Sequence, residues 1–124
     1  MGSRFRGPLT AFRVASLDHP IFDGEGAAAY GGRWNSIGRR VIYASEQMGT
    51  AMFEILVHAG IKRLPLATHF VEIAIPGALE VERIDETDVP GWRTDDRSKS
   101  RAFGDAWHED GKIGERPAVL LVPS

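Results

Sequence analysis

Residues 31–36, Gly-Gly-Arg-Trp-Asn-Ser, place an arginine beside two glycines. Small neighbours let a phosphate group approach the backbone, and the guanidinium of Arg33 can make paired, charge-assisted hydrogen bonds to it. A lone arginine is more often a surface charge or a member of a structural ion pair. The segment therefore leaves two interpretations of Arg33 open, a phosphate clamp and an ordinary surface cation.

A tyrosine and a glutamate follow this segment, Tyr43 in the run Val-Ile-Tyr-Ala at 41–44 and Glu54 further on. A carboxylate can stabilise a developing positive charge or orient a nucleophile. An aromatic ring can stack on a cation, a contact worth about 1 kcal/mol or more when water is excluded. Taken alone, a helical glutamate is usually solvated and a strand tyrosine is usually core. The proposed chemistry therefore depends on whether both side chains line one cleft.

A helix predicted over residues 46–58 must position Glu54. At about 100° per residue, Gln47, Thr50, Glu54 and His58 fall on one narrow polar stripe. The other face is an apolar arc of about 200°, formed by Met48, Met52, Phe53, Ile55, Leu56 and Val57. This arc predicts a helix that is buried on most sides. Its polar stripe then either faces solvent or lines a cleft.

The rest of the chain predicts a mixed α/β (α+β) fold in one compact domain. Strands are expected at 9–15, 41–44, 67–75, 79–83 and 118–122, the last of them buried, and a second helix at 99–109. Ser45 offers a side-chain oxygen to cap the helix that follows it. A turn is expected at Pro76-Gly77, and residues 85–99 are expected to form a loop inside the domain.

Composition narrows the class of protein. The 124 residues carry a formal net charge of −2 and a pI near 6.1, which gives no reason to expect nucleic-acid or anionic-membrane binding. The absence of cysteine excludes disulfides, zinc–cysteine sites and thiol nucleophiles, and it suits a cytoplasmic protein. There is neither a secretion-signal pattern nor an apolar run of the roughly 20 residues that span a bilayer.

Two familiar sequence motifs occur here without the surrounding residues that would make them functional. Residues 24–29 read Gly-Glu-Gly-Ala-Ala-Ala, but no hydrophobic strand precedes them, and the glycines at 31–32 do not continue a helix, so a dinucleotide-binding fingerprint is rejected. Glu54 and His58 stand four residues apart, as a metal pair might, but there is no third ligand nearby. A surface ion pair explains them better, and no metal site is predicted.

Three segments in succession resemble the RES domain family: Gly-Gly-Arg-Trp-Asn at 31–35, Tyr-Ala-Ser at 43–45, and Glu54 followed by Leu-Val-His at 56–58. A closing Val-Pro-Ser at 122–124 completes the pattern, so the resemblance covers nearly the whole chain. It implies a fold similar to ADP-ribosyltransferases. Residues 1–8 are then an N-terminal extension or cloning remnant, and 9–124 form the RES domain. Family members usually continue beyond the Val-Pro-Ser, which implies that the domain lacks its C-terminal end here.

The resemblance also implies a function. RES domains act as toxins beside an Xre-like antitoxin, and they consume NAD⁺ as a substrate without a metal. The bond between nicotinamide and ribose is cleaved, and ADP-ribose passes to a host protein, water or phosphate. An oligomer formed through the antitoxin complex is expected. The alternative is a catalytically silent binding module that acts through its antitoxin.

Site residues follow from matching the family pattern. The resemblance implies that the catalytic residues are Glu54, Tyr43 and Arg33. The residues implied to contact NAD⁺ are Arg13, Gly32, Arg33, Trp34, Asn35, Tyr43, Ser45 and Ser124. Among these, Trp34 is expected mainly as a packing anchor, while Asn35 and Ser45 either bond the ligand or hold a turn and cap the helix.

Overall fold

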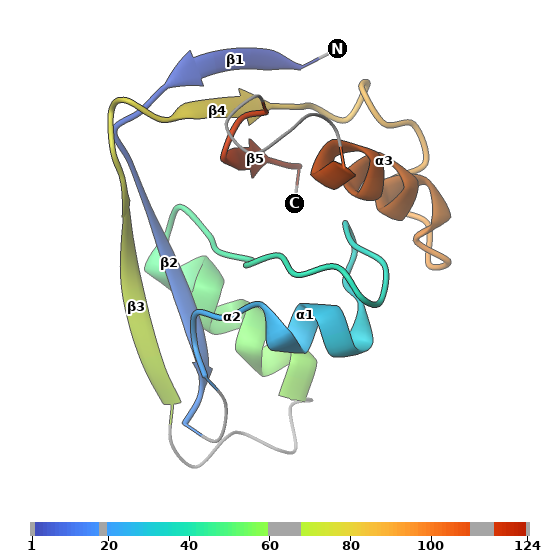
Figure 1. The fold of residues 1–124 in the computed structure, drawn as a ribbon. Helices are drawn as coiled ribbons and strands as arrows, with labels where there is room; N and C mark the ends of the chain where they lie inside the picture. Colours follow the sequence, from blue (N-terminus) through green and yellow to red (C-terminus); the bar gives the residue numbers. More distant parts are fainter. Residues whose placement is uncertain (1, 18–19, 60–67, 110–115, 124) are drawn as a thin grey trace.

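The computed structural model describes residues 2–17, 20–59, 68–109 and 116–123, with the side chains of 58 and 59 excepted, and shows a mixed α/β domain (Figure 1). In chain order the elements are β1 (Ser3–Arg6), β2 (Leu9–Ser16), α1 (Glu25–Tyr30), α2 (Met48–Ala59), β3 (Thr68–Ile75), β4 (Glu80–Arg83), α3 (Ser98–Glu109) and β5 (Val119–Leu121). The predicted fold class is confirmed. In the described part of the chain no helix is long and apolar enough to cross a membrane.

The strands form two small sheets that meet at a corner. β1 pairs antiparallel with β4, which pairs parallel with β5, while β2 and β3 form an antiparallel ribbon. Only Gly7 and Pro8 separate β1 from β2, and the turn that starts at Pro76 separates β3 from β4. Proline has no N–H for a ladder, so pairing stops at the corner and the ribbon changes direction. The segment between α1 and α2, teal in Figure 1, runs between the two halves.

The hydrophobic core gathers around two tryptophans. Trp34, Ile84, Val89 and Trp92 form a buried cluster, and Phe103 of α3 packs against it. The rings of Trp34 and Trp92 stack with centroids 6.0 Å apart, and Phe103 meets Trp34 edge-on at 6.2 Å. The 31–36 segment is therefore anchored in the core, as the packing role expected for Trp34 requires.

Helix α3 touches this segment at its backbone. A Cβ atom on Gly104 would lie 1.7 Å from the carbonyl oxygen of Trp34, far inside van der Waals contact. Any side chain at that position would therefore push α3 away from the core. Glycine lets the helix rest directly on the 31–36 backbone.

Several predicted elements are confirmed within one or two residues: β2, β3, β4, β5, α3 and the turn at Pro76. Residues 85–97 form the expected loop, and α3 begins at Ser98. The strand β5 is only partly buried, so the prediction of a buried strand there was too strong.

The strand predicted over 41–44 is wrong. Only Ser45 pairs with a strand, through Ser45 N–H to Phe12 O at 2.8 Å and Phe12 N–H to Ser45 O at 2.7 Å. The guanidinium of Arg13 donates to the carbonyl of Tyr43 at 3.1 Å. A side chain thus takes an acceptor that a strand ladder would need. Because α2 begins at Met48, Ser45 is not the helix cap that the sequence predicted.

Helix α1 was missed inside the glycine-rich segment. Gly24 (φ 70°) and Gly31 (φ 71°) bound it, and the Asp23 carboxylate accepts the N–H of Glu25 at 2.9 Å. Positive φ suits glycine, so both residues mark ends of the helix. The alanines between them favour a helix, and the sequence prediction overlooked them because it gave more weight to the glycines.

The wide burial predicted for α2 is also wrong. Ala51 is buried, but Met52, Phe53 and Val57 are 53%, 63% and 57% exposed. The helix packs against β2. Periodicity identified the apolar residues of α2, but Met52, Phe53, Leu56 and Val57 are exposed in the described part of the chain. The sequence pattern cannot show how much of such an arc is covered.

Candidate active site

The hydroxyl of Tyr43 holds the 31–36 segment in its bent form. It accepts the backbone N–H of Trp34 at 2.9 Å and donates to Oδ1 of Asn35 at 2.7 Å. A Cβ atom on Gly32 would lie 2.7 Å from this hydroxyl and 2.8 Å from Asn35 Oδ1. Glycine at position 32 is therefore required by the close approach of Tyr43 and Asn35.

The side chain of Asn35 is used within the protein. Its amide nitrogen lies 2.8 Å from Ala27 O, 3.2 Å from Ser36 O and 3.1 Å from Arg39 O, and the residue is 1% exposed. With its oxygen bonded to Tyr43, Asn35 ties the segment to α1. Of the two roles expected for Asn35, the structure shows the one that holds a turn.

Tyr43 is neutral in this environment. Burial raises the pKa of its hydroxyl most, while the Trp34 N–H and the charges of Arg101 and Arg97 lower it in part and Asp105 raises it. The net pKa lies above the ordinary tyrosine value. The hydroxyl therefore keeps its proton near pH 7 and can donate to Asn35.

Arg33 is half-buried and attached at one nitrogen. Its Nη1 donates to the carbonyls of Trp92 at 3.0 Å and Thr94 at 3.2 Å. Within the described ranges, neither Nε nor Nη2 makes a hydrogen bond, and Arg33 forms no salt bridge. The carbonyls fix the guanidinium plane and leave donors for an anion, so the geometry suits a phosphate clamp.

Arg13 joins three parts of the chain. Its Nε donates to Ile21 O at 2.7 Å and its Nη1 to Tyr43 O at 3.1 Å. Burial lowers the pKa of its guanidinium, and the charge of Asp23 opposes that shift. Arg13 and Ser45 together hold the segment around Tyr43 against β2.

Glu54 lies on a different element. It is exposed on α2, as are Gln47 and Thr50 of the same polar stripe. It takes part in none of the hydrogen bonds that join Arg33, Asn35 and Tyr43. The structure thus brings together the predicted residues from Gly32 to Ser45, places Glu54 on the helix that follows them, and leaves Ser124 outside the described residues.

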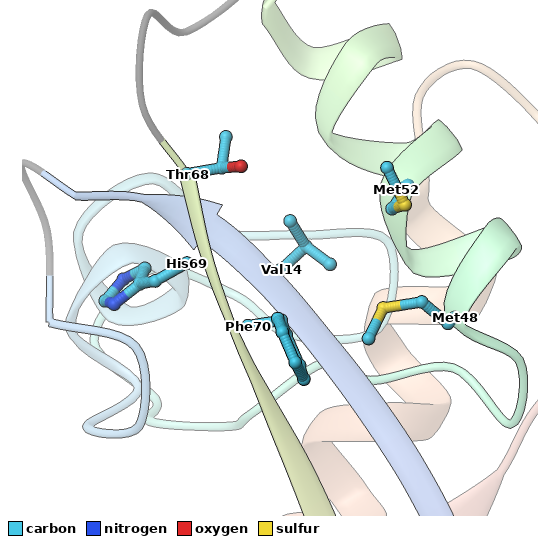
Figure 2. A pocket seen from close by; sticks show the side chains of 6 residues that line it. All are labelled: Val14, Met48, Met52, Thr68, His69 and Phe70. Atoms are coloured by element: carbon cyan, nitrogen blue, oxygen red, sulfur yellow. The ribbon is translucent and has the colours of Figure 1, made fainter.

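A pocket of about 280 Å³ lies beside α2, but it is a separate feature (Figure 2). Its lining residues are Val14, Met48, Met52, Thr68, His69 and Phe70. Among the described lining residues, none is a predicted site residue and none is an arginine or lysine that could balance phosphate charge. This described lining is apolar and does not match a dinucleotide site.

Sequence reasoning missed one face of α3 that lies against the 31–36 segment. Arg101 Nε donates to Gly32 O at 2.8 Å, and the carboxylate of Asp105 accepts both the N–H and the hydroxyl of Ser36, at 2.9 and 2.5 Å. Burial raises the pKa of Asp105, but these two hydrogen bonds and the charges of Arg39 and His108 outweigh it and leave the pKa low. The spacing of four residues from 97 to 101 to 105 was the available signal.

Comparisons with known proteins point to one family. The RES domain family matches residues 10–124. The Prs ADP-ribosylating toxin of Sphingobium sp. (strain YBL2) is 36% identical over 107 residues, which are 82% of this chain and 63% of that protein. A protein named Toxin Res from Photorhabdus laumondii is 33% identical over 106 residues, 83% of this chain and 64% of its own length. The chain therefore spans a little under two thirds of these relatives.

A solved structure shows the same fold. The match is to the crystal structure of the M. tuberculosis MbcT–MbcA toxin–antitoxin complex, with a TM-score of 0.61, 23% identity, and coverage of 86% of this chain and 66% of the other. At this identity the likeness concerns the fold alone. The family match extends over almost the entire chain, and both relatives named above exceed 30% identity. The chain belongs to the RES domain family.

Proposed function

We propose that this chain carries the active site of a toxin that cleaves the nicotinamide–ribose bond of NAD⁺ and transfers ADP-ribose to an acceptor. The observation that supports the proposal most is the bend at residues 31–36, which Tyr43 and Asn35 hold in place around Arg33. A rigid bend with a half-buried guanidinium suits the diphosphate of NAD⁺. The Sphingobium relative is named an ADP-ribosylating toxin, which supports the same reaction class.

Cleavage of the nicotinamide–ribose bond requires few catalytic groups from the protein. Nicotinamide leaves as a neutral group when the bond breaks, because the positive charge of its ring passes to the ribose as an oxocarbenium ion. The step needs no general acid. One carboxylate, that of Glu54, can accept a hydrogen bond from a ribose hydroxyl and stabilise the cation, by a few kcal/mol in comparable preorganised sites. Water, phosphate or a protein side chain then supplies the electron pair that forms the new bond at the ribose carbon.

Other residues have supporting roles in this proposal. The ring of Tyr43 stacks on the nicotinamide while its hydroxyl holds the bend. Gly32, Trp34 and Asn35 shape the backbone that the diphosphate approaches, and Arg13 and Ser45 attach the segment to β2. Ser124 contacts the ribose or orients Glu54.

A cognate antitoxin is part of the proposal. An enzyme that removes NAD⁺ harms its own cell unless a partner blocks it. The fold neighbour was solved as a toxin–antitoxin complex, which supports a partner of that kind for this cytoplasmic toxin. An Xre-like antitoxin and an oligomer built through it remain predictions.

The test follows nicotinamide release from NAD⁺ labelled in the adenosine part, in phosphate buffer and in lysate. Glu54→Gln should lower the rate by about 10²-fold or more, in line with the loss of one preorganised electrostatic group. Glu46→Gln, an exposed glutamate just before α2, is the matched control and should keep the rate. Label on protein, ADP-ribose 1-phosphate or free ADP-ribose identifies the acceptor. A folded chain that releases no nicotinamide would refute the enzyme and leave a binding module.

A further inference from the structure

The guanidiniums of Arg33 and Arg101 lie at the bend at residues 31–33, and the backbone of Arg97 is linked to both residues. Arg101 Nε donates to Gly32 O at 2.8 Å, and its Nη2 lies 3.0 Å from where a Cβ on Gly31 would stand. The carbonyl of Thr94 accepts both Nη1 of Arg33, at 3.2 Å, and the backbone N–H of Arg97, at 3.1 Å. The carbonyl of Thr94 thus links the Arg33 side chain to the backbone of Arg97, and the bond from Arg101 to Gly32 O links α3 to the bend.

No carboxylate balances these charges in the described part of the chain. Arg33, Arg97 and Arg101 are all half-buried, and none forms a salt bridge there within 4.0 Å, whereas Arg40 and Arg93 do on the surface. The acid of the same α3 face, Asp105, is already bonded to Ser36 and paired with Arg39 at 3.3 Å. Partly buried cations without a counter-charge are costly to desolvate, and a bound anion would supply the counter-charge.

The backbone at Arg97 is held in an unusual conformation. Its φ of 58° lies in the left-handed region, which costs a non-glycine residue about 1 kcal/mol or more. Hydrogen bonds from Arg97 N–H to Thr94 O and from Arg101 N–H to Arg97 O, at 2.9 Å, keep it there. The carboxylate of Asp96 already caps the first turn of α3 through Ser98 N–H at 3.0 Å. The helix end is therefore satisfied without the Arg97 side chain, which makes no hydrogen bond within the described residues.

We infer that Arg97 and Arg101 join Arg33 in a three-arginine site that binds a diphosphate. The identity of the ligand as NAD⁺ rests on the proposed function, but the anion site itself does not. Arg101 uses Nε to hold Gly32 and has Nη donors left over, since no described residue bonds them. Arg97 lies one helical turn before Arg101, whose N–H donates to the carbonyl of Arg97 at 2.9 Å, so positions 97 and 101 share one face. The diphosphate then lies beside the tyrosine that faces the nicotinamide in the proposed reaction.

The first experiment measures binding of inorganic pyrophosphate and of ADP-ribose to the whole chain by calorimetry, in low and moderate salt. Arg97→Ala and Arg101→Lys should each weaken both affinities by about 10-fold or more, because each loses a forked, charge-assisted contact. Arg93→Ala is the matched control: it lies in the same loop and is exposed, its guanidinium pairs with Glu86 and lies over the Trp92 ring at 5.0 Å, and the variant should bind as the parent does.

Folding is checked separately by urea unfolding. Arg101→Ala removes the bond to Gly32 O and can destabilise the bend, so the inference depends on Arg101→Lys and on Arg97→Ala, whose side chain makes no hydrogen bond within the described residues. Unchanged pyrophosphate affinity in both folded variants, or no binding by the parent chain, would overturn the site.

The two proposals fail in different ways. Pyrophosphate has no glycosidic bond, so its binding does not depend on cleavage, and Glu54→Gln should bind it normally. Arginine-dependent binding without nicotinamide release supports the anion site and refutes the enzyme. Release of nicotinamide that is indifferent to Arg97 and Arg101 supports the enzyme and refutes the site.

Discussion

Replacement of Tyr43 by phenylalanine tests how the bend around Arg33 is held. The change keeps the ring and removes one oxygen, which accepts Trp34 N–H at 2.9 Å and donates to Asn35 Oδ1 at 2.7 Å. Both partners belong to buried residues, and Asn35 is 1% exposed. Water therefore cannot readily replace the lost hydroxyl.

The expected loss of stability follows from these two bonds. Each net hydrogen bond is worth about 1 kcal/mol, and a buried group left unpaired costs about 1–3 kcal/mol. Partial relaxation of the bend recovers some of that, so we expect Tyr43→Phe to lower the free energy of unfolding by about 2–4 kcal/mol. At roughly 2.1 cal/mol/K per residue, unfolding entropy is about 0.26 kcal/mol/K for this chain, which gives a fall in Tm of about 8–15 °C.

Urea and thermal unfolding followed by tryptophan fluorescence provide the assay, because Trp34 and Trp92 lie in the core beside the bend. Tyr30→Phe is the control: that tyrosine is 82% exposed, and its variant should change stability by less than about 0.5 kcal/mol. A Tyr43→Phe variant as stable as this control, with an unchanged m-value, would show that the hydroxyl does not hold the bend.

Two further substitutions test the contact between α3 and the bend. Gly104→Ala should lower the free energy of unfolding in urea by about 3 kcal/mol or more, because its Cβ would meet Trp34 O. Gly49→Ala in α2, which has open space around it, is the control and should be neutral or stabilising by up to about 1 kcal/mol. Equal effects of the two substitutions would contradict the tight contact. The low pKa of Asp105 means that its carboxylate stabilises the fold above its unfolded pKa of about 3.9 and that this contribution disappears as pH falls through the lower folded value. Asp105→Asn disturbs the hydrogen bonds from Ser36 and should therefore lower the free energy of unfolding at pH 7 by about 1–3 kcal/mol. Between about pH 5 and pH 2 the variant should lose less stability than the parent. Parallel pH profiles of the two proteins would refute the role of the carboxylate.

The sequence predicted those secondary-structure elements that depend on local patterns of residues. β2 and β3 lie within one residue of their predicted bounds, and α3 begins within one residue of its predicted start. The glycine-rich segment misled because an alanine helix of six residues is short enough to be hidden between two glycines. At 41–44, β-branched residues favoured a strand, but Arg13 occupies the Tyr43 carbonyl through its side chain.

The site was predictable in part for a similar reason. The resemblance to the RES family implied Arg33, Asn35 and Tyr43 as site residues, and the structure joins Tyr43 to Asn35 beside Arg33. The sequence could not reveal Arg101, because the contact of its guanidinium with Gly32 spans 69 residues of sequence. Helical spacing shows that 97, 101 and 105 share a face of α3, but only tertiary packing shows what that face meets.

The exposed apolar arc of α2 gives this chain an internal chemical reporter. The thioether of Met52 stands largely in water, while Met48, one turn earlier, is half-buried. Peroxide should convert Met52 to its sulfoxide faster than Met48, since oxidation of methionine follows access to the sulfur. Any molecule that covers α2 will slow that reaction. The relative oxidation of these two methionines, read by peptide mass spectrometry, therefore reports whether this face of the helix is occupied in a cell extract.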